Sequence, residues 1–218
     1  MPASMNLIVV GQSGQGTILV SKTLVTALQS AGRTVVCTEY PAITHRFAIT
    51  YSAIRSGAHV RSPRIRPREA DLILGLEPFE CLRVSLLYAN PSTLVITNDE
   101  FIRIDGELNP LLTAPVPTQT AADVAAVLVE RGISSVVAIA ASEIALRTLK
   151  SRAGTNMVLL GAGWASGRIP LDQETLERTI VEVAPRGTGE RNCEAFRAGI
   201  AAFEAAVARA AVGIPAAR

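Results

Sequence analysis

The stretch NLIVVGQSGQGTILVSKTLVTALQSAG, residues 6–32, decides the fold of this chain. Residues 6–10 form a short, β-branched apolar run of the kind found in buried strands, and Gly11 ends it. Residues 17–31 then carry apolar side chains at helical spacing until Gly32, a residue type that often ends helices. The order strand, glycine loop and helix predicts the opening unit of an α/β protein.

A second strand is expected at residues 34–37, ending near Glu39, which gives a βαβ unit with a right-handed crossover. Further strands are expected at 48–55, 71–76, 93–97 and 136–140, and helices at 79–89, 121–131, 142–152, 156–165, 173–184 and 192–212. Residues 101–108 resemble a small hairpin, and the proline-rich residues 110–117 a connection. We therefore expect a Rossmann-like, mostly parallel sheet with helices on both faces and a helical C-terminal part.

The chain has 218 residues, a length that suits one large domain or two small ones. We find no internal repeat and no clean break between periodic segments. We therefore expect a single domain over 1–218, with a glycine-loop α/β half at 1–98 and a more helical half at 99–218.

Composition limits the class of protein. Hydrophobic residues make up 49% and charged residues 18% of the chain, which is typical of a globular protein rather than a disordered one. No uncharged apolar run reaches about 18 residues, and the start MPASM lacks the regions of a signal peptide. The net charge of +2 is too small for a general nucleic-acid footprint. We expect a cytoplasmic protein with no membrane span and no nucleic-acid partner.

The three cysteines, Cys37, Cys81 and Cys193, are widely scattered and form no CxxC pair. The only histidines are His45 and His59, so local spacing offers no metal-ligand cluster and no site for an iron–sulfur cluster. Buried, inert thiols are the simplest interpretation. Any redox cofactor is therefore expected outside this chain.

The glycine loop is the first candidate site. Between a strand and a helix, its N–H groups and the positive helix end point at one place where an anion can sit. The spacing is GxxGxG, whereas the dinucleotide fingerprint is GxGxxG and a P-loop ends in Gly-Lys-Ser/Thr. The alternative is a tight turn whose glycines serve packing alone. The polar side chains of Ser13 and Gln15 argue against this alternative, because a purely structural turn does not need them. The candidate ligands are Gly11, Ser13, Gly14, Gln15 and Gly16.

Three polar residues, Thr44, His45 and Arg46, follow the second strand, at the end where open α/β sheets bind ligands. Arg46 could clamp a carboxylate or phosphate, and His45 could exchange a proton near neutral pH. These two are the candidate catalytic residues, and Thr44 is a candidate for cofactor binding. The alternative is a loop whose polar groups form a structural ion pair.

Two acidic residues also follow strands. Glu39 lies a little over twenty residues past Gly16, where an acid can bind a ribose hydroxyl; a solvated carboxylate is the alternative. Glu77 precedes Pro78 and Glu80, which suit the first turn of a helix, and it also lies at a strand's carboxyl end. Both are carried forward as candidate cofactor-binding residues.

An arginine-rich stretch begins at the end of the expected strand at 48–55 and continues toward the expected strand at 71–76. Prolines interrupt it, so it is extended rather than helical, and it lacks the aromatic residues that stack on bases. A solvated loop or a surface facing a partner protein is expected. Its arginines are Arg55, Arg61, Arg64, Arg66 and Arg68.

Seven strings, taken in order, resemble the small subunits of indolepyruvate:ferredoxin oxidoreductases and, more broadly, the γ domains of pyruvate and 2-oxoacid oxidoreductases. They span nearly the whole chain. They are GQSGQG at 11–16, EYPAITHRFA at 39–48 leading into AIRSG at 53–57, ADLILGLEPFE at 70–80, Asn98, TNMVLLGA at 155–162, IPL at 169–171, and the closing pattern at 192–199. Ser13 stands where that family usually has glycine, and Ala42 and His45 where it usually has glycine and glutamine, so the shape of the ligand is in question.

The resemblance implies a subunit that is inactive alone. A large partner would hold thiamine diphosphate, Mg and iron–sulfur clusters, decarboxylate a 2-oxo acid such as indolepyruvate or another aryl pyruvate, and pass electrons to ferredoxin, while coenzyme A (CoA) takes the acyl group. This chain would help close the active site and seat an anion of CoA or substrate. The competing hypotheses are a non-catalytic nucleotide- or CoA-binding module and an independent NAD(P)-binding Rossmann protein.

Overall fold

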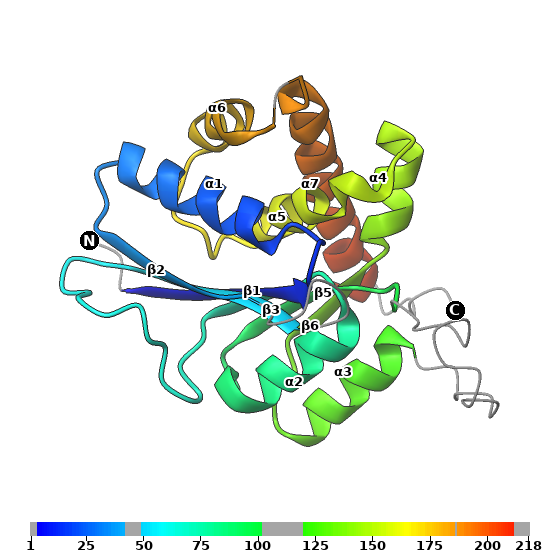
Figure 1. The fold of residues 1–218 in the computed structure, drawn as a ribbon. Coiled ribbons are helices and arrows are strands. Elements are labelled where there is room, and N and C mark those ends of the chain that lie inside the picture. The colour runs from blue at the N-terminus through cyan, green and yellow to red at the C-terminus, as the bar shows by residue number, and fades with distance from the viewer. Residues whose placement is uncertain (1–3, 42–48, 102–119, 186, 212–218) are drawn as a thin grey trace, which may run out of the picture.

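A computed structural model describes residues 4–41, 49–101, 120–185 and 187–211 of the chain (Figure 1). Each strand and helix expected from the sequence within these ranges is present, with ends shifted by at most a few residues. In chain order the elements are β1 (Met5–Gln12), α1 (Thr17–Ser30), β2 (Val35–Tyr40), β3 (Ile49–Ser56), β4 (Leu72–Gly75), α2 (Pro78–Tyr88), β5 (Leu94–Asn98), α3 (Ala121–Glu130), β6 (Val136–Ile139), α4 (Ala141–Leu149), the 3₁₀ turn η1 (Arg152–Gly154), α5 (Thr155–Ala165), α6 (Gln173–Val183) and α7 (Gly189–Ala211).

The strands form one six-stranded sheet in the order β2-β3-β1-β4-β5-β6 (Figure 1). Strand β1 pairs in parallel with β4, β4 with β5, and β5 with β6. Strand β3 is antiparallel to both of its neighbours, β1 and β2, and so runs against the rest of the sheet. The mostly parallel, Rossmann-like sheet expected from the sequence is confirmed.

The first βαβ unit differs from the simplest expectation. Strands β1 and β2 point the same way, but β3 lies between them and pairs with both, as in Leu7↔Ile54 and Cys37↔Ile54. The connection from β2 to β3, residues 41–48, is shorter than the dozen or so residues that a parallel crossover needs. The chain must therefore turn back, which makes β3 antiparallel and moves β2 to the edge of the sheet.

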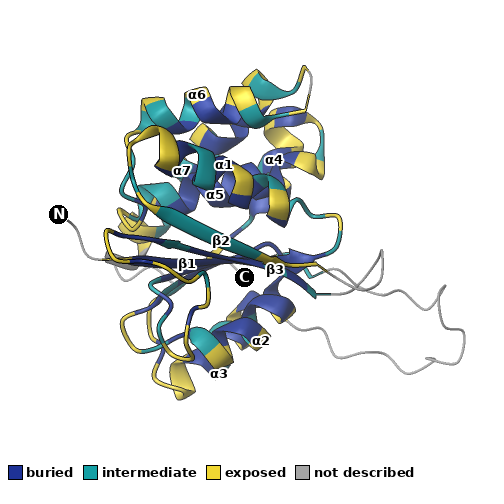
Figure 2. Cartoon of the chain, turned by 60° about the vertical axis from the view of Figure 1, so that its left-hand side comes forward, coloured by how far each residue is buried: buried dark blue, intermediate teal, exposed yellow. Residues whose placement is uncertain are grey.

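Helices cover both faces of the sheet. Helices α1, α4, α5, α6 and α7 lie on one face, and α2 and α3 lie on the other (Figure 1). Side chains of β1 alternate accordingly: Leu7 and Val9 belong to the core beneath α1 and α5, whereas Ile8 and Val10 belong to the core beneath α2. Figure 2 shows the buried residues in dark blue along the sheet and on the inner sides of the helices.

Helix α5 is the innermost helix. Its residues 155–163 are all buried, and it contacts both the central strands and α7. Two glycines permit the approach to α7. A Cβ added to Gly161 would overlap the carbonyl oxygen of Phe196, and one added to Gly199 would overlap that of Val158. The two backbones therefore touch, which no larger residue at these positions would allow.

Both halves of the chain contribute to one sheet, since β6 from the second half pairs with β5 from the first. Helix α7 begins at Gly189, three residues before the expected start. The expected hairpin, apart from Phe101, and the proline-rich connection lie outside the described residues. In the part of the chain that is described, no helix combines the length and apolar character needed to cross a membrane.

The crossing of α5 and α7 generates a stability prediction. Gly161→Ala and Gly199→Ala should each lower the free energy of unfolding by about 1 to 3 kcal/mol, because the added methyl forces the helices apart. At an open helix position the same exchange stabilises by up to about 1 kcal/mol. Guanidinium denaturation measures the difference. Ala201→Ser, on the exposed side of α7, should stay within about 0.5 kcal/mol of the unmodified chain; a gain in stability for either glycine variant would show that the helices are not in backbone contact.

Candidate functional site

The glycine loop, residues 11–16, passes from the carboxyl end of β1 to the start of α1. Gly14 (φ 94°) and Gly16 (φ 86°) adopt left-handed conformations, which cost a residue with a side chain about 1 to 2 kcal/mol. Gly16 is the N-cap of α1, and within the described part of the chain this helix start has no side-chain cap. The first N–H groups and the positive end of the helix dipole are therefore left for an anion.

The side chain of Gln15 holds the glycine loop in place through two hydrogen bonds. Its side-chain carbonyl accepts a hydrogen bond from the Gln12 N–H at 2.7 Å, and its amide donates to the carbonyl of Leu76, just beyond β4, at 3.1 Å. Gly11 lies against this arrangement, because an added Cβ would come within 2.7 Å of the Gln15 oxygen and 2.9 Å of the Leu76 Cβ. The side chain of Gln15 therefore ties the end of β1 to the end of β4, and its role toward a ligand stays a prediction.

The start of α5 packs directly against the loop. The Asn156 amide donates to the Gly16 carbonyl at 3.4 Å, and a Cβ on Gly16 would overlap that amide. The N-cap of α5 is Gly154, the last residue of η1, and the Met157 N–H in the first turn of α5 donates to the Asn156 side-chain carbonyl at 2.8 Å. The starts of α1 and α5 thus meet at Gly16, although they are about 140 residues apart in the sequence.

A buried polar network extends from this contact to the end of β5. Asn98 accepts a hydrogen bond from the Ser142 N–H at 3.2 Å and donates to the Ser142 hydroxyl at 2.9 Å. Thr155 donates to the same hydroxyl at 3.4 Å, so α4 and α5 are held together where both begin. Asn98, Ser142, Thr155 and Asn156 are all at most 9% exposed.

The sequence indicated this network only in part. Asn98 and Asn156 belong to strings that carry the family resemblance, but no role was assigned to them. Two signals were available: a polar residue at the carboxyl end of a strand, and residues that favour helix starts, as at Thr155 and Asn156.

Glu77 lies beside the loop, at the end of β4. It is 1% exposed, caps α2, and accepts a hydrogen bond from the Glu80 N–H at 2.8 Å. Pro78 begins α2 and Glu80 lies in its first turn, as the sequence predicted. The structure therefore gives Glu77 a capping role, and a role in cofactor binding stays a prediction.

Glu39 occupies an exposed position near the end of β2 and accepts a hydrogen bond from the Ser21 hydroxyl of α1 at 3.1 Å. In a dinucleotide fold the strand carrying the ribose-binding acid lies next to β1. Here β3 lies between β1 and β2, so the strand that carries Glu39 is farther from β1 by one strand spacing of about 4.8 Å. This arrangement disfavours the NAD interpretation of Glu39.

Two of the remaining candidates, Ser13 and Gly14, lie in the glycine loop itself. Ser13 is half-buried and Gly14 exposed, so both can meet a ligand from solvent. Thr44, His45 and Arg46 lie outside the described residues.

Asp99, which follows β5, was not singled out from the sequence. Burial, and to a lesser extent the negative charge of Glu100 and Glu143, raises the pKa of its carboxyl above the ordinary value. Glu100 itself forms an ion pair with Arg152. Asp99, whose ionised form is disfavoured, therefore lies at the carboxyl ends of the parallel strands, next to the helix starts.

The described residues do not fit a metal or an iron–sulfur cluster. They contain no group of three or more His, Cys, Asp or Glu residues arranged to hold a metal ion. The cysteines lie apart, on β2, α2 and α7. Burial raises the pKa of Cys37 to about 11 and that of Cys81 to about 12, and it also raises that of Cys193, so none is a ready thiolate.

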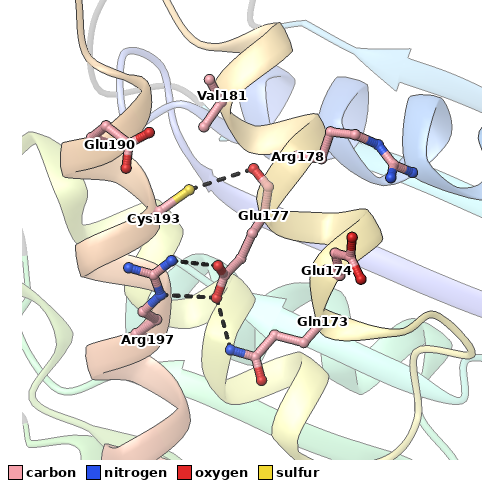
Figure 3. Close-up of a pocket in the computed structure, with 8 residues that line it drawn as sticks. All are labelled: Gln173, Glu174, Glu177, Arg178, Val181, Glu190, Cys193 and Arg197. Atoms are coloured by element: carbon pink, nitrogen blue, oxygen red, sulfur yellow. Dashed lines mark hydrogen bonds and ion pairs between the residues drawn. The ribbon is translucent and has the colours of Figure 1, made fainter.

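A shallow pocket of about 480 Å³ lies between α6 and α7, and its lining includes no residue of the glycine loop (Figure 3). Four of its residues are bonded to one another, around Glu177. Glu177 accepts hydrogen bonds from Arg197 at 2.9 Å and from Gln173 at 2.7 Å, and the Cys193 thiol points at the Glu177 carbonyl. The Arg197 guanidinium lowers the pKa of Glu177. This pocket is a packing groove between two helices.

Comparison with protein families gives one match over most of the chain. The model of the pyruvate ferredoxin/flavodoxin oxidoreductase family matches residues 6–202. The chain is 30% identical over 195 residues to the indolepyruvate oxidoreductase subunit IorB of Archaeoglobus fulgidus, covering 89% of this chain and 93% of that protein. It is also 30% identical over 197 residues to the IorB subunit of Methanothermobacter thermautotrophicus, covering 90% and 96%.

Solved structures share the fold. A keto/oxoacid ferredoxin oxidoreductase γ subunit from Geobacter sulfurreducens has a TM-score of 0.64 at 19% identity, covering 94% of this chain and 99% of that one. Pyruvate oxidoreductase subunit PORC from Thermotoga maritima has a TM-score of 0.65 at 19% identity, covering 92% and 97%. In 2-oxoglutarate:ferredoxin oxidoreductase from Magnetococcus marinus, 97% of this chain matches 32% of a longer chain, with a TM-score of 0.56 at 17% identity.

The bracing role of Gln15 can be tested by stability. Gln15→Ala leaves the Gln12 N–H and the Leu76 carbonyl without their partner, so we expect the free energy of unfolding to fall by about 1 to 3 kcal/mol. Urea denaturation measures it. Ser13→Ala, in the same loop but without a hydrogen bond among the described residues, is the matched control and should change stability by less than about 0.5 kcal/mol. Equal effects of the two changes would contradict the bracing role.

The thiols generate a prediction about reactivity. Because the thiolate is the reactive form, a pKa of about 11 makes Cys37 roughly 100-fold less reactive at pH 8 than an ordinary exposed cysteine, and its rate should rise with pH up to about 11. Cys81, with a pKa of about 12 and no exposure, should react only after unfolding. Labelling with a disulfide reagent, with and without guanidinium, measures both rates. Rapid labelling of Cys81 in the native chain would show that the thiol is accessible.

Proposed function

Because the chain belongs to the pyruvate ferredoxin/flavodoxin oxidoreductase family, we propose that it is the small subunit of an oxidoreductase acting on indolepyruvate or another aryl pyruvate. The relatives that match nearly its whole length are named indolepyruvate oxidoreductase subunits. In the proposed reaction the 2-oxo acid loses carbon dioxide, its acyl group passes to CoA, and two electrons pass to ferredoxin.

The observation that carries this proposal is the meeting of two helix N-termini at the glycine loop. Helix α1 begins at Gly16 without a side-chain cap, and Asn156 at the start of α5 holds this helix start through the Gly16 carbonyl. The first N–H groups and the positive dipole end of α1 therefore lie at the glycine loop, which suits a phosphate or carboxylate. The chain would seat the phosphate groups of CoA or the carboxylate of the substrate there.

Arg46 and His45 complete the proposed site. An arginine after β2 would clamp the same anion through two parallel hydrogen bonds, and a histidine beside it would hold or release a proton near neutral pH. Thr44, Ser13 and the loop amides would orient the ligand. These roles stay predictions, because residues 42–48 lie outside the described part of the chain.

We assign the redox chemistry to a larger partner subunit. The described residues contain no group arranged to hold a metal ion, and their cysteines lie apart, on β2, α2 and α7. Thiamine diphosphate with Mg, bound by the partner, would supply the decarboxylation chemistry, and its iron–sulfur clusters would carry the electrons. Support comes from the Magnetococcus marinus enzyme, in which the same fold makes up about a third of a longer chain.

The subunit assignment predicts activity only in the complex. The chain alone should show no oxidation of indolepyruvate, and the complex should require CoA and reduce ferredoxin. Gly14→Val tests the anion seat: it should raise the KM for CoA at least about tenfold, a loss of about 1.4 kcal/mol in binding, because the side chain would stand where the anion approaches.

Gly187→Val is the matched control. It has the same left-handed backbone (φ 78°) and, like Gly14, no atom within 4 Å of an added Cβ, but it lies between α6 and α7. It should leave the KM for CoA unchanged. Full turnover by the lone chain would overturn the subunit assignment, and equal KM values for the two variants would remove the anion seat from the loop.

A further inference from the structure

Residues 61–68, here called the arginine loop, form a fixed and exposed basic segment. Arg61, Arg64, Arg66 and Arg68 are all exposed, whereas Ile65 is 3% exposed and anchors the loop in the core beneath α2. The prolines at 63 and 67 fix the backbone between the arginines. Little conformational freedom is left to lose on binding, which favours this loop as a binding surface.

Further contacts hold the loop in place. Arg55 of β3 donates to the carbonyls of Ser62 and Arg64, and the Arg68 N–H donates to the Leu87 carbonyl of α2 at 3.1 Å. Among the described residues Arg66 pairs with Glu69, whereas the guanidinium groups of Arg64 and Arg68 have no acidic partner. The loop therefore presents charges that the chain itself does not neutralise.

Exposed apolar side chains lie on α2, which contacts the loop at Leu87, and on α3, which packs against α2. Leu86 and Leu87, in the last turn of α2, are 45% and 50% exposed, and Val129, near the end of α3, is 53% exposed. Helix α2 follows β4, and both α2 and α3 run back to the end of the sheet at which the parallel strands begin. The arginine loop lies at this same end, because it precedes β4. Apolar side chains beside arginines are the combination that marks protein interfaces, with an apolar centre and a charged rim.

The two halves of the sequence differ in net charge. Residues 1–98 contain nine Lys and Arg against five Asp and Glu, whereas residues 99–218 contain twelve against fourteen. The basic excess therefore belongs to the half that carries the arginine loop. The arginine loop lies at the amino ends of the parallel strands and the glycine loop at their carboxyl ends. A protein bound to the arginine loop would therefore leave the proposed anion site open.

We propose that the arginine loop, together with Leu86, Leu87 and Val129, docks the large partner subunit through an apolar surface rimmed by carboxylates. This inference rests on the proposed function. A second copy of the chain is disfavoured, because a two-fold contact would bring the same unneutralised arginines together. A nucleic acid is disfavoured, because it would leave the leucines without a partner and the loop offers no aromatic residue for stacking.

The test measures the dissociation constant between the purified chain and the purified large subunit by calorimetry at low and high salt. We expect Leu87→Asp, and separately the triple reversal Arg64→Glu, Arg66→Glu and Arg68→Glu, each to raise Kd at least about 30-fold. The reversal should also remove most of the salt dependence seen with the unmodified chain. If the reversal does not fold, Arg64→Gln with Arg68→Gln should raise Kd about tenfold.

Arg178→Glu and Val181→Asp are the matched controls, because they change the same residue classes at exposed positions of α6. They should leave Kd within about threefold. If the unmodified chain does not bind the large subunit, the proposed function fails. If it binds and the loop variants bind equally well, only the docking surface is wrong. Self-association of the lone chain through these residues, or displacement of the partner by RNA, would also overturn it.

Discussion

Helices α5 and α7 approach each other so closely at Gly161 and Gly199 that a methyl group would not fit at either position. This contact seats α5 deep on the sheet, with residues 155–163 all buried. Since α5 begins at Thr155, its depth determines that Asn156 reaches the Gly16 carbonyl. The geometry of the glycine loop therefore depends on a crossing in the middle of the helix, at Val158 and Gly161, between backbones rather than side chains.

The candidate site is assembled from segments far apart in sequence. The glycine loop provides the start of α1, residues 155 and 156 the start of α5, and Asn98 with Ser142 the polar link to β5 and α4. Each segment has a structural partner: Gln15 braces β1 against Leu76, and Glu77 caps α2. The loop therefore keeps its shape without a ligand, which reduces the free energy lost in ordering it when an anion binds.

The two ends of the parallel strands suit different kinds of binding. At the carboxyl ends of the parallel strands, the starts of α1 and α5 meet at Gly16, next to exposed Gly14, where the anion is proposed to bind. At the amino edge, a proline-stiffened loop exposes arginines beside two leucines and can bind a protein. The thiols belong to neither edge as reactive groups, since burial raises their pKa. A family member with these properties would contribute binding and positioning to a larger enzyme and leave electron transfer to its partner.

The sequence by itself determined the elements, because apolar periodicity and glycine breaks are local: the strand at Asn6–Val10, the helix from Thr17 and the turn between them all appear. It also showed three scattered cysteines with no CxxC pair. Only the tertiary structure decided the strand order, since the short connection after Tyr40 forces β3 to turn back and separates Glu39 from the loop. It also decided the partners of Gln15, Asn98 and Asn156, because hydrogen bonds between distant segments depend on packing that no local pattern encodes.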